Sequence, residues 1–219
     1  MYETHMHTSE VSACALNSAK EQIKFYKKMG YAGVIVTDHF VNGNSTCPKN
    51  YSWEKKMNHI IKGFIEAKKA GIKHDIDVFL GWEYTIRGTD FLTYGLGLDF
   101  LLENPDLARL SAEQYSSRVR QNGGFLAQAH PYRNAFYIDR PFPVSPHFID
   151  AVEVRNSADS EGTNSRAFEF AATHNIPMQA GTDSHKINSH AYSGIILKEK
   201  ANSIEDIIEA IKTKNIDLI

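Results

Sequence analysis

Strand-like and helix-like segments alternate along most of the 219 residues of this chain. Short apolar, β-branched runs such as residues 32–37 are typical of strands that are buried on both faces. Between them lie segments such as 53–70, in which apolar side chains recur at helical spacing before Gly71 ends the pattern. Such alternation builds a parallel sheet covered by helices, and a chain of this length can close the sheet into a barrel.

The expected elements follow one another without an internal repeat, a low-complexity tract or a linker. The sequence predicts strands at 2–7, 32–37, 77–82, 91–96, 125–129, 151–154, 177–180 and 192–197, and helices at 17–29, 53–70, 111–121, 163–174 and 203–214. Residues 41–51 and 134–148, rich in turn-forming or aromatic side chains, are expected to be loops. We therefore expect a single domain that covers residues 1–219.

The composition is that of a globular protein, with 42% hydrophobic and 23% charged residues. A formal net charge of −2 argues against stable nucleic-acid binding through charge, although it is compatible with a small phosphorylated ligand. The sequence contains no stretch of about 18 apolar residues and no apolar leader, so we expect a cytoplasmic protein without a membrane partner. Cys14 and Cys47 lack the spacing of a zinc knuckle and are expected to be isolated, partly buried thiols.

Ten histidines are the unusual feature of the composition, and several fall at the ends of predicted strands. His5 and His7 close the first strand, where residues i and i+2 point to the same face, so their imidazoles should project side by side. Later strands end in further residues of this kind, namely His39, Glu83, His130, Asp183 and His185. Because the carboxyl ends of parallel strands meet at one rim of a barrel, we expect all of these side chains to converge there.

A cluster of imidazoles and carboxylates without a thiolate favours divalent zinc, manganese or iron. Two or three neighbouring metals need bridging carboxylates, which Glu83 and Asp183 can supply. Such a centre lowers the pKa of a bridging water toward neutrality and holds the attacking and leaving oxygens of a phosphate ester. His174, by contrast, ends a predicted helix and is expected to be an ordinary surface or packing residue.

Five short motifs resemble those of the polymerase-and-histidinol-phosphatase (PHP) family. They are His5-x-His7, Thr37-Asp38-His39, Gly81-x-Glu83, Ala129-His130-Pro131 and Gly181-Thr182-Asp183-x-His185, in the order and approximate spacing of that family. Together they extend over residues 4–185, and the combination is specific although no single motif is. The chain resembles a stand-alone member, because it has no room for an attached polymerase.

The resemblance implies an α/β fold, a distorted TIM-like (β/α)7 barrel, that holds two or three divalent metal ions. It also implies hydrolysis of a phosphate ester by a metal-bound hydroxide, with Glu83 and Asp183 holding the catalytic water. By position, the first metal would be bound by His5, His7, Glu83 and Asp183. The second would be bound by Glu83 and His130, and the third by His39 and His185.

The sequence departs from the family pattern at two places. Many relatives carry a histidine where Gly88-Thr89-Asp90-Phe91 stands here, and we take Asp90 as its substitute at the second metal. In relatives, a residue that serves the third metal follows the first motif by six to eight positions, a region that reads Glu10-Val11-Ser12-Ala13 here. Either Glu10 reaches the third metal, or water completes its ligand shell.

A phosphate ester also needs positive charge beside the metals, and three cations lie near the predicted rim. They are Arg133, Arg155 and Lys186, of which the two arginines are suited to bidentate contact with phosphate. The substrate is expected to be a small phosphoester. Histidinol phosphate, a nucleotide phosphate and an oligonucleotide end all remain compatible with the sequence.

Two other functions remain open beside the phosphoesterase. Metal-dependent amide hydrolases on (β/α)8 barrels also begin with His-x-His, but they usually carry a bridging lysine, and no predicted strand here ends in lysine. A non-catalytic, metal-bound interaction module would usually have lost ligands, whereas the set here is nearly complete.

Overall fold

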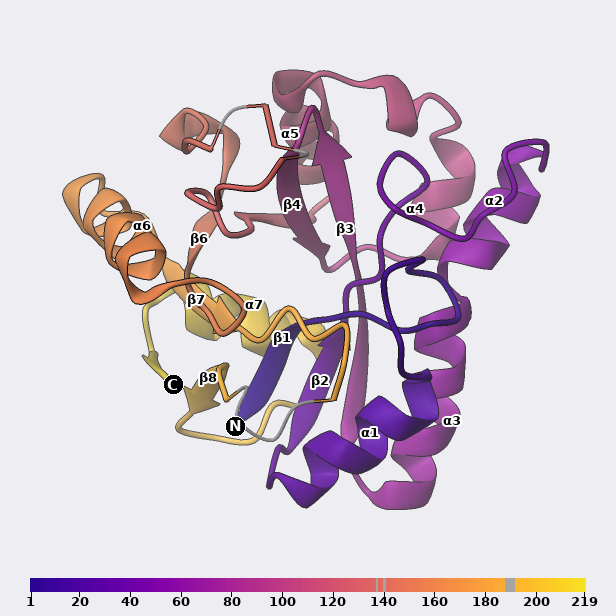
Figure 1. Ribbon diagram of the computed structural model, residues 1–219, viewed down its shortest axis with the longest axis horizontal. Helices are drawn as coiled ribbons and strands as arrows, with labels where there is room; N and C mark the ends of the chain where they lie inside the picture. The colour runs from indigo at the N-terminus through magenta and orange to yellow at the C-terminus, as the bar shows by residue number, and fades with distance from the viewer. Residues whose placement is uncertain (137, 140, 188–191) are drawn as a thin grey trace.

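A curved sheet of nine strands organises the residues that the computed structural model describes, which are 1–136, 138–139, 141–187 and 192–219 (Figure 1). The strands are β1 (Tyr2–Met6), β2 (Gly33–Val36), β3 (Asp77–Ile86), β4 (Thr89–Tyr94), β5 (Phe125–Gln128), β6 (Ala151–Asn156), β7 (Met178–Gly181), β8 (Ile195–Leu197) and β9 (Ile216–Leu218). Their order in the sheet is β7-β6-β5-β4-β3-β2-β1-β8-β9.

The sheet curves until β7 lies beside β1. Met6 forms a parallel bridge with Ser184, and Thr4 Oγ1 donates a hydrogen bond to the carbonyl of Ala180 at 2.8 Å. Strands β1 to β7 therefore form a nearly closed barrel, while β8 and β9 extend outward from β1. This confirms the expected distorted TIM-like barrel. The short strand β9 was not predicted, and β8 is shorter than the predicted 192–197.

Strand direction differs from the all-parallel expectation at β4 and β8. β4 pairs antiparallel with both β3 and β5, and β8 pairs antiparallel with β1. Ile86 and Thr89 face each other across a turn made by Arg87 and Gly88, which both have positive φ. Two such residues are what a tight hairpin requires. The amino end of β4 therefore lies beside the carboxyl end of β3.

Seven α-helices lie in the described part of the chain. They are α1 (Ala19–Lys28), α2 (Trp53–Ile60), α3 (Lys62–His74), α4 (Leu98–Glu103), α5 (Ala112–Gln121), α6 (Glu161–Thr173) and α7 (Ile204–Lys212). Serine N-caps begin several of them, and Ser18 forms a capping box with Glu21 at α1. The expected helix over 53–70 is two helices, because Ile61 leaves the helical conformation between α2 and α3. Helix α4 was not predicted.

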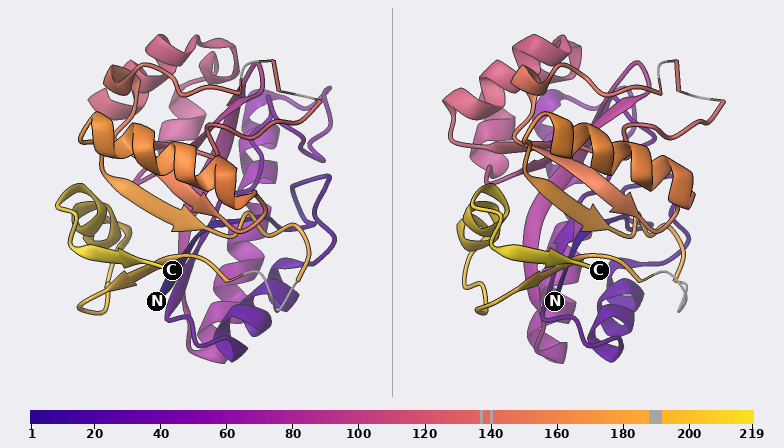
Figure 2. Two further views of the ribbon diagram at one scale, coloured as in Figure 1. Left: turned by 60° about the vertical axis from the view of Figure 1, so that its left-hand side comes forward. Right: turned by 90° about the vertical axis from the view of Figure 1, so that its left-hand side faces the viewer.

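The helices cover the outside and one end of the barrel (Figure 2). Helices α1 and α3 lie side by side and bury Ile23, Tyr26 and Ala67 in a cluster with β2. Helix α7 packs its isoleucines against Tyr2 and Phe125, at the starts of β1 and β5. The rim predicted from the strand ends lies at the opposite end of the barrel, where β1 ends. None of the helices in the described residues combines the length and apolar character that a membrane span requires.

Candidate metal centre

Strand β1 delivers two histidines to one space, as the His-x-His spacing predicts. His5 and His7 are completely buried, and their Nε2 atoms lie 3.1 Å apart. The rings are tilted against each other at a centroid separation of 5.1 Å. The rigid strand therefore presents two imidazole nitrogens to a single point without any loop having to rearrange.

Two carboxylates from other strands face these imidazoles. Oε1 of Glu83, on β3, lies 3.3 Å from His5 Nε2 and 3.2 Å from His130 Nε2. Oδ1 of Asp183, which follows β7, lies 3.3 Å from His5 Nε2 and 3.1 Å from His7 Nε2. Glu83 thus contacts imidazoles on both sides, which is the position of a bridging ligand between two cations.

Asp90 joins Glu83 and His130 in a second group of candidate ligands. Thr85 Oγ1 donates a hydrogen bond to Asp90 Oδ1 at 2.6 Å, while Oδ2 lies 3.9 Å from His130 Nε2. Burial first and Glu83 second raise the pKa of Asp90. The antiparallel course of β4 explains this placement, because Asp90 reaches the rim from the amino end of its strand.

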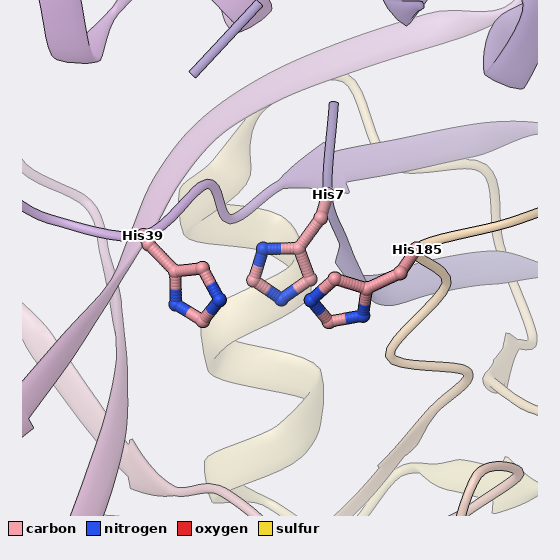
Figure 3. A group of neighbouring side chains, drawn as sticks. All are labelled: His7, His39 and His185. Atoms are coloured by element: carbon pink, nitrogen blue, oxygen red, sulfur yellow. The ribbon is translucent and has the colours of Figure 1, made fainter. Parts of the chain in front are cut away.

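A third group consists of His7, His39 and His185, which Figure 3 shows in a row with His7 between the other two. The ring centroid of His7 lies 4.4 Å from that of His39 and 4.1 Å from that of His185. His39 follows β2 and His185 follows β7. The three groups share members and therefore form one continuous cluster at the barrel rim.

The charges of the cluster suit divalent metal ions. Burial alone would raise the pKa of Glu83, but His39 and His5 hold it well below its usual range. Burial, followed by the neighbouring His185 and His39, holds the pKa of His7 well below its usual value, and a neutral imidazole is the form that binds a metal. Glu83 Oε2 and Asp183 Oδ1 are buried without a hydrogen-bond partner in the described residues. A cation would satisfy both oxygens.

Backbone strain occurs at two of these candidate ligands. His130 has φ 28° and Asp183 has φ 53°, conformations that residues other than glycine rarely adopt. Strain of this kind persists where the surrounding structure holds a residue firmly, and it often marks functional sites. Both residues are also buried.

Buried carboxylates behind the cluster orient its histidines. Glu153, on β6, lies 2.9 Å from His5 Nδ1 through its Oε1. Asp38 accepts hydrogen bonds from the backbone N–H of Thr8 at 2.6 Å and from Ser12 Oγ at 2.7 Å. Ser12 Oγ also lies 3.0 Å from His7 Nδ1. Partners of this type fix ring orientation and tautomer in metal sites.

Of the three predicted phosphate-binding cations, the structure brings Arg133 into the site. Its Nη1 donates to Asp183 Oδ2 at 2.5 Å, and its Nε donates to Asp159 Oδ1 at 2.7 Å. Arg155 and Lys186 are exposed and do not border the cavity above the cluster. Arg155 points outward because it occupies the solvent-facing position in an otherwise buried β6.

Glu10, the possible third-metal ligand, has its carboxylate engaged at the start of α1. Both of its carboxylate oxygens accept the backbone N–H of Ala19, at 3.1 and 2.9 Å, at the start of α1. The side chain that approaches His39 from this loop is Cys14, whose Sγ lies 3.2 Å from His39 Nε2. Burial raises the pKa of the Cys14 thiol, but hydrogen bonds to His185 and His39 lower it to about 6.

A cavity of about 950 Å³ opens above the cluster. Its wall contains six of the candidate ligands, His39, Glu83, Asp90, His130, Asp183 and His185, together with Cys14, Arg133 and Asp159. Its volume lies at the upper end of the range for sites that bind small molecules. The arrangement therefore joins a shared set of candidate metal ligands, one arginine and space for an organic molecule.

Solved structures share this fold. A two-domain protein from Bacteroides vulgatus, described as containing a predicted PHP-like metal-dependent phosphoesterase, matches with a TM-score of 0.75 and 15% identity over 100% of this chain and 64% of its own. Residues 161–216 of this chain also match the family model described as PHP-associated. The chain thus shares its fold with a solved PHP-like structure, and part of it matches a PHP-associated family model.

Two further structures carry other names. A lesion-specific endonuclease from Pyrococcus furiosus matches this chain with a TM-score of 0.64 and 17% identity, over 99% of this chain and 57% of its own. An amidohydrolase from Chromobacterium violaceum, with bound sulfate and no metal, matches with a TM-score of 0.58 and 12% identity, over 99% and 97%. This chain thus spans less than two thirds of the Bacteroides and Pyrococcus proteins. A search of curated proteins finds no match.

Proposed function

We propose that this chain belongs to the PHP family and is a metal-dependent phosphoesterase that hydrolyses a small phosphoester. The observation that carries the proposal is the sharing of Glu83 and His7 among overlapping groups of candidate metal ligands, most of which line one cavity. Shared carboxylates are typical of two-metal and three-metal centres that act on phosphate esters. A structural site, by contrast, would be closed to solvent.

Each group would hold one divalent cation. His5, His7 and Asp183, with Glu83, suit the first, and Glu83, Asp90 and His130 suit the second. His39 and His185 suit the third. When bound, the metals would polarise a phosphoryl oxygen and supply a water of lowered pKa. The donor set of imidazoles and carboxylates fits zinc, manganese or iron.

Arg133 would bind the phosphoryl group. Its Nε and Nη1 are engaged by Asp159 and Asp183, which fix the plane of the guanidinium beside the metal ligands. Its Nη2 is buried and has no hydrogen-bond partner in the described residues. Arg133 borders the cavity, where its positive charge would attract a phosphoryl group and stabilise the charge that develops in the transition state.

Hydrolysis assays of the purified protein, loaded with Mn²⁺ or Zn²⁺, on three substrates test this proposal. We expect hydrolysis of para-nitrophenyl phosphate, or of bis-para-nitrophenyl phosphate if a diester is preferred, and none of a cyclic amide. Arg133→Ala should lose most of the phosphatase activity, whereas Arg155→Ala should keep it. Amide hydrolysis without phosphatase activity would favour the amidohydrolase alternative. However, no lysine borders the cavity in the described part of the chain.

A further inference from the structure

We propose that the thiolate of Cys14 is a ligand of the third metal, together with His39 and His185. The inference rests on the metal centre proposed above and adds a ligand that the family motifs do not contain. It would fill the position for which Glu10 was the sequence candidate. A sulfur donor would make this cation site chemically different from the other two.

The geometry of Cys14 matches that of a shared ligand. Its Sγ lies 3.2 Å from His39 Nε2. Two donors on one tetrahedral zinc, with a Zn–S distance of about 2.3 Å and a Zn–N distance of about 2.0–2.1 Å, are roughly 3.6 Å apart. A movement of a few tenths of an ångström would therefore admit a cation between the two atoms.

The ring nitrogens of His39 and His185 are arranged to bind this third cation. His39 Nδ1 lies 2.7 Å from Glu83 Oε2, which leaves Nε2 facing Cys14. His185 Nδ1 lies 3.0 Å from the carbonyl of Asp183, which leaves its Nε2 for a ligand. A carboxylate or carbonyl partner on one ring nitrogen is the usual way in which a protein orients a metal-binding histidine.

Backbone contacts hold Cys14 at this place from both sides. The N–H of Ala13 donates to the carbonyl of Asn44 at 2.8 Å, in the loop that follows His39. The N–H of Leu16 donates to the carbonyl of His185 at 2.7 Å. Cys14 is half-buried and borders the same cavity as the two histidines. Its loop is thus tied directly to both loops that carry the other proposed ligands.

The imidazoles around Cys14 point to a cation independently of the thiol. Glu83 Oε2, on a side chain that is 2% exposed, lies 2.7 Å from His39 Nδ1 and holds the ring with its other nitrogen toward Cys14. His7, His39 and His185 also form a group of candidate ligands without counting Cys14. With sulfur added to nitrogen donors, this position would select zinc over manganese, because soft thiolates prefer zinc.

Cobalt substitution tests the proposal by a signal that does not depend on activity. We expect the Co²⁺-loaded wild type to show a near-ultraviolet charge-transfer band from sulfur to cobalt. Cys14→Ser should lose this band and one bound cobalt per chain. Cys47→Ser is the matched control, because Cys47 is the other half-buried free thiol and does not border the cavity. It should keep both the band and the cobalt.

Alkylation of the wild type provides a test that needs no variant to fold. Iodoacetamide should modify Cys14 at least tenfold more slowly in zinc-loaded than in chelated protein, whereas Cys47 should react at the same rate in both. Absence of the band at full cobalt loading, its persistence in Cys14→Ser, or equal Cys14 alkylation would each overturn the proposal. If phosphatase activity persists in that case, only this inference fails. If the chain binds no cobalt at all, the proposed function fails with it.

Discussion

Nδ1 of His5 lies 2.9 Å from Oε1 of Glu153, and neither side chain has any exposed surface. The other oxygen of Glu153 accepts the backbone N–H of His130 at 3.0 Å and Nδ2 of Asn156 at 2.8 Å. One buried carboxylate therefore orients the His5 ring toward the cluster and also fixes the strained residue His130.

Replacing this carboxylate should weaken metal binding. In Glu153→Gln, a single acceptor oxygen must serve both His5 and the backbone of His130, so one of them loses its partner. We expect metal affinity to fall by about 10–100-fold, as for other residues that orient metal ligands. Competition with a chromophoric chelator measures this. Glu169→Gln, on the exposed face of α6, is the control and should bind as the wild type does.

Removal of a metal ligand should abolish the stabilisation that metal provides. At a metal concentration one hundred times the dissociation constant, binding stabilises a protein by about 2.7 kcal/mol. We expect chelation to lower the melting temperature of the wild type and of His174→Ala, which alters an exposed residue. His7→Ala and Asp183→Ala should melt at a temperature that depends less on chelation, and both should lose activity. An unchanged metal content in His7→Ala would contradict the ligand assignment.

Arg133 should act on substrate binding through the geometry of its guanidinium. Lysine at this position keeps the charge but cannot contact Asp159, Asp183 and phosphate at once. We expect Arg133→Lys to raise the KM for para-nitrophenyl phosphate by roughly tenfold, the equivalent of about 1.4 kcal/mol. Steady-state kinetics measure it, with Arg155→Lys as the exposed counterpart. Equal KM values in the two variants would exclude a direct phosphate contact by Arg133.

The contribution of Glu3 to the stability of the metal-free protein should fall as the pH rises toward neutrality. Burial is the main reason that the pKa of Glu3 is raised from 4.5 to about 7, although hydrogen bonds from His5 and Thr182 oppose it. Between these two values the folded chain holds a proton that the unfolded chain has lost. The corresponding stabilisation is complete below about pH 4.5 and is lost by about pH 7, an effect on the order of 3 kcal/mol.

Urea denaturation of chelated protein at pH 5 and pH 8 measures this effect. In Glu3→Gln the side chain is neutral at every pH, so the difference in unfolding free energy between the two pH values should shift by the Glu3 contribution. An identical pH dependence in the wild type and the variant would show that Glu3 is ionised throughout.

The sequence was a good guide to the barrel because most strands are continuous apolar runs between clear helical stripes. It was a poor guide to strand direction at β4, which depends on the two-residue turn at Arg87 and Gly88 rather than on the strand's own residues. Helix α2 ends and α3 begins around Ile61, a residue that interrupts no hydrophobic pattern. The apolar stripe therefore could not reveal the break.

The candidate site likewise contains residues that the sequence predicted and residues that it did not. Residues at strand ends, such as His39 and His130, were found because the barrel topology alone brings strand ends together. Glu153 was missed as a positioning residue because it lies inside a strand, and only the curvature of the sheet turns it toward His5. Cys14 was missed because its position depends on backbone contacts of its loop with two distant loops. Those contacts have no signature in residue type, and the spacing of Cys14 from His7, seven positions, was not used because Glu10 was taken as the candidate.

Elemental analysis of the purified protein, combined with a para-nitrophenyl phosphate assay, shows whether the cluster at the barrel rim is a catalytic metal centre. We expect two or three equivalents of zinc, manganese or iron per chain. Chelation should remove the turnover, and adding metal back should restore it. A protein that contains no metal, and that remains inactive after zinc or manganese is added, would contradict the assignment of the histidine and carboxylate cluster as a metal centre.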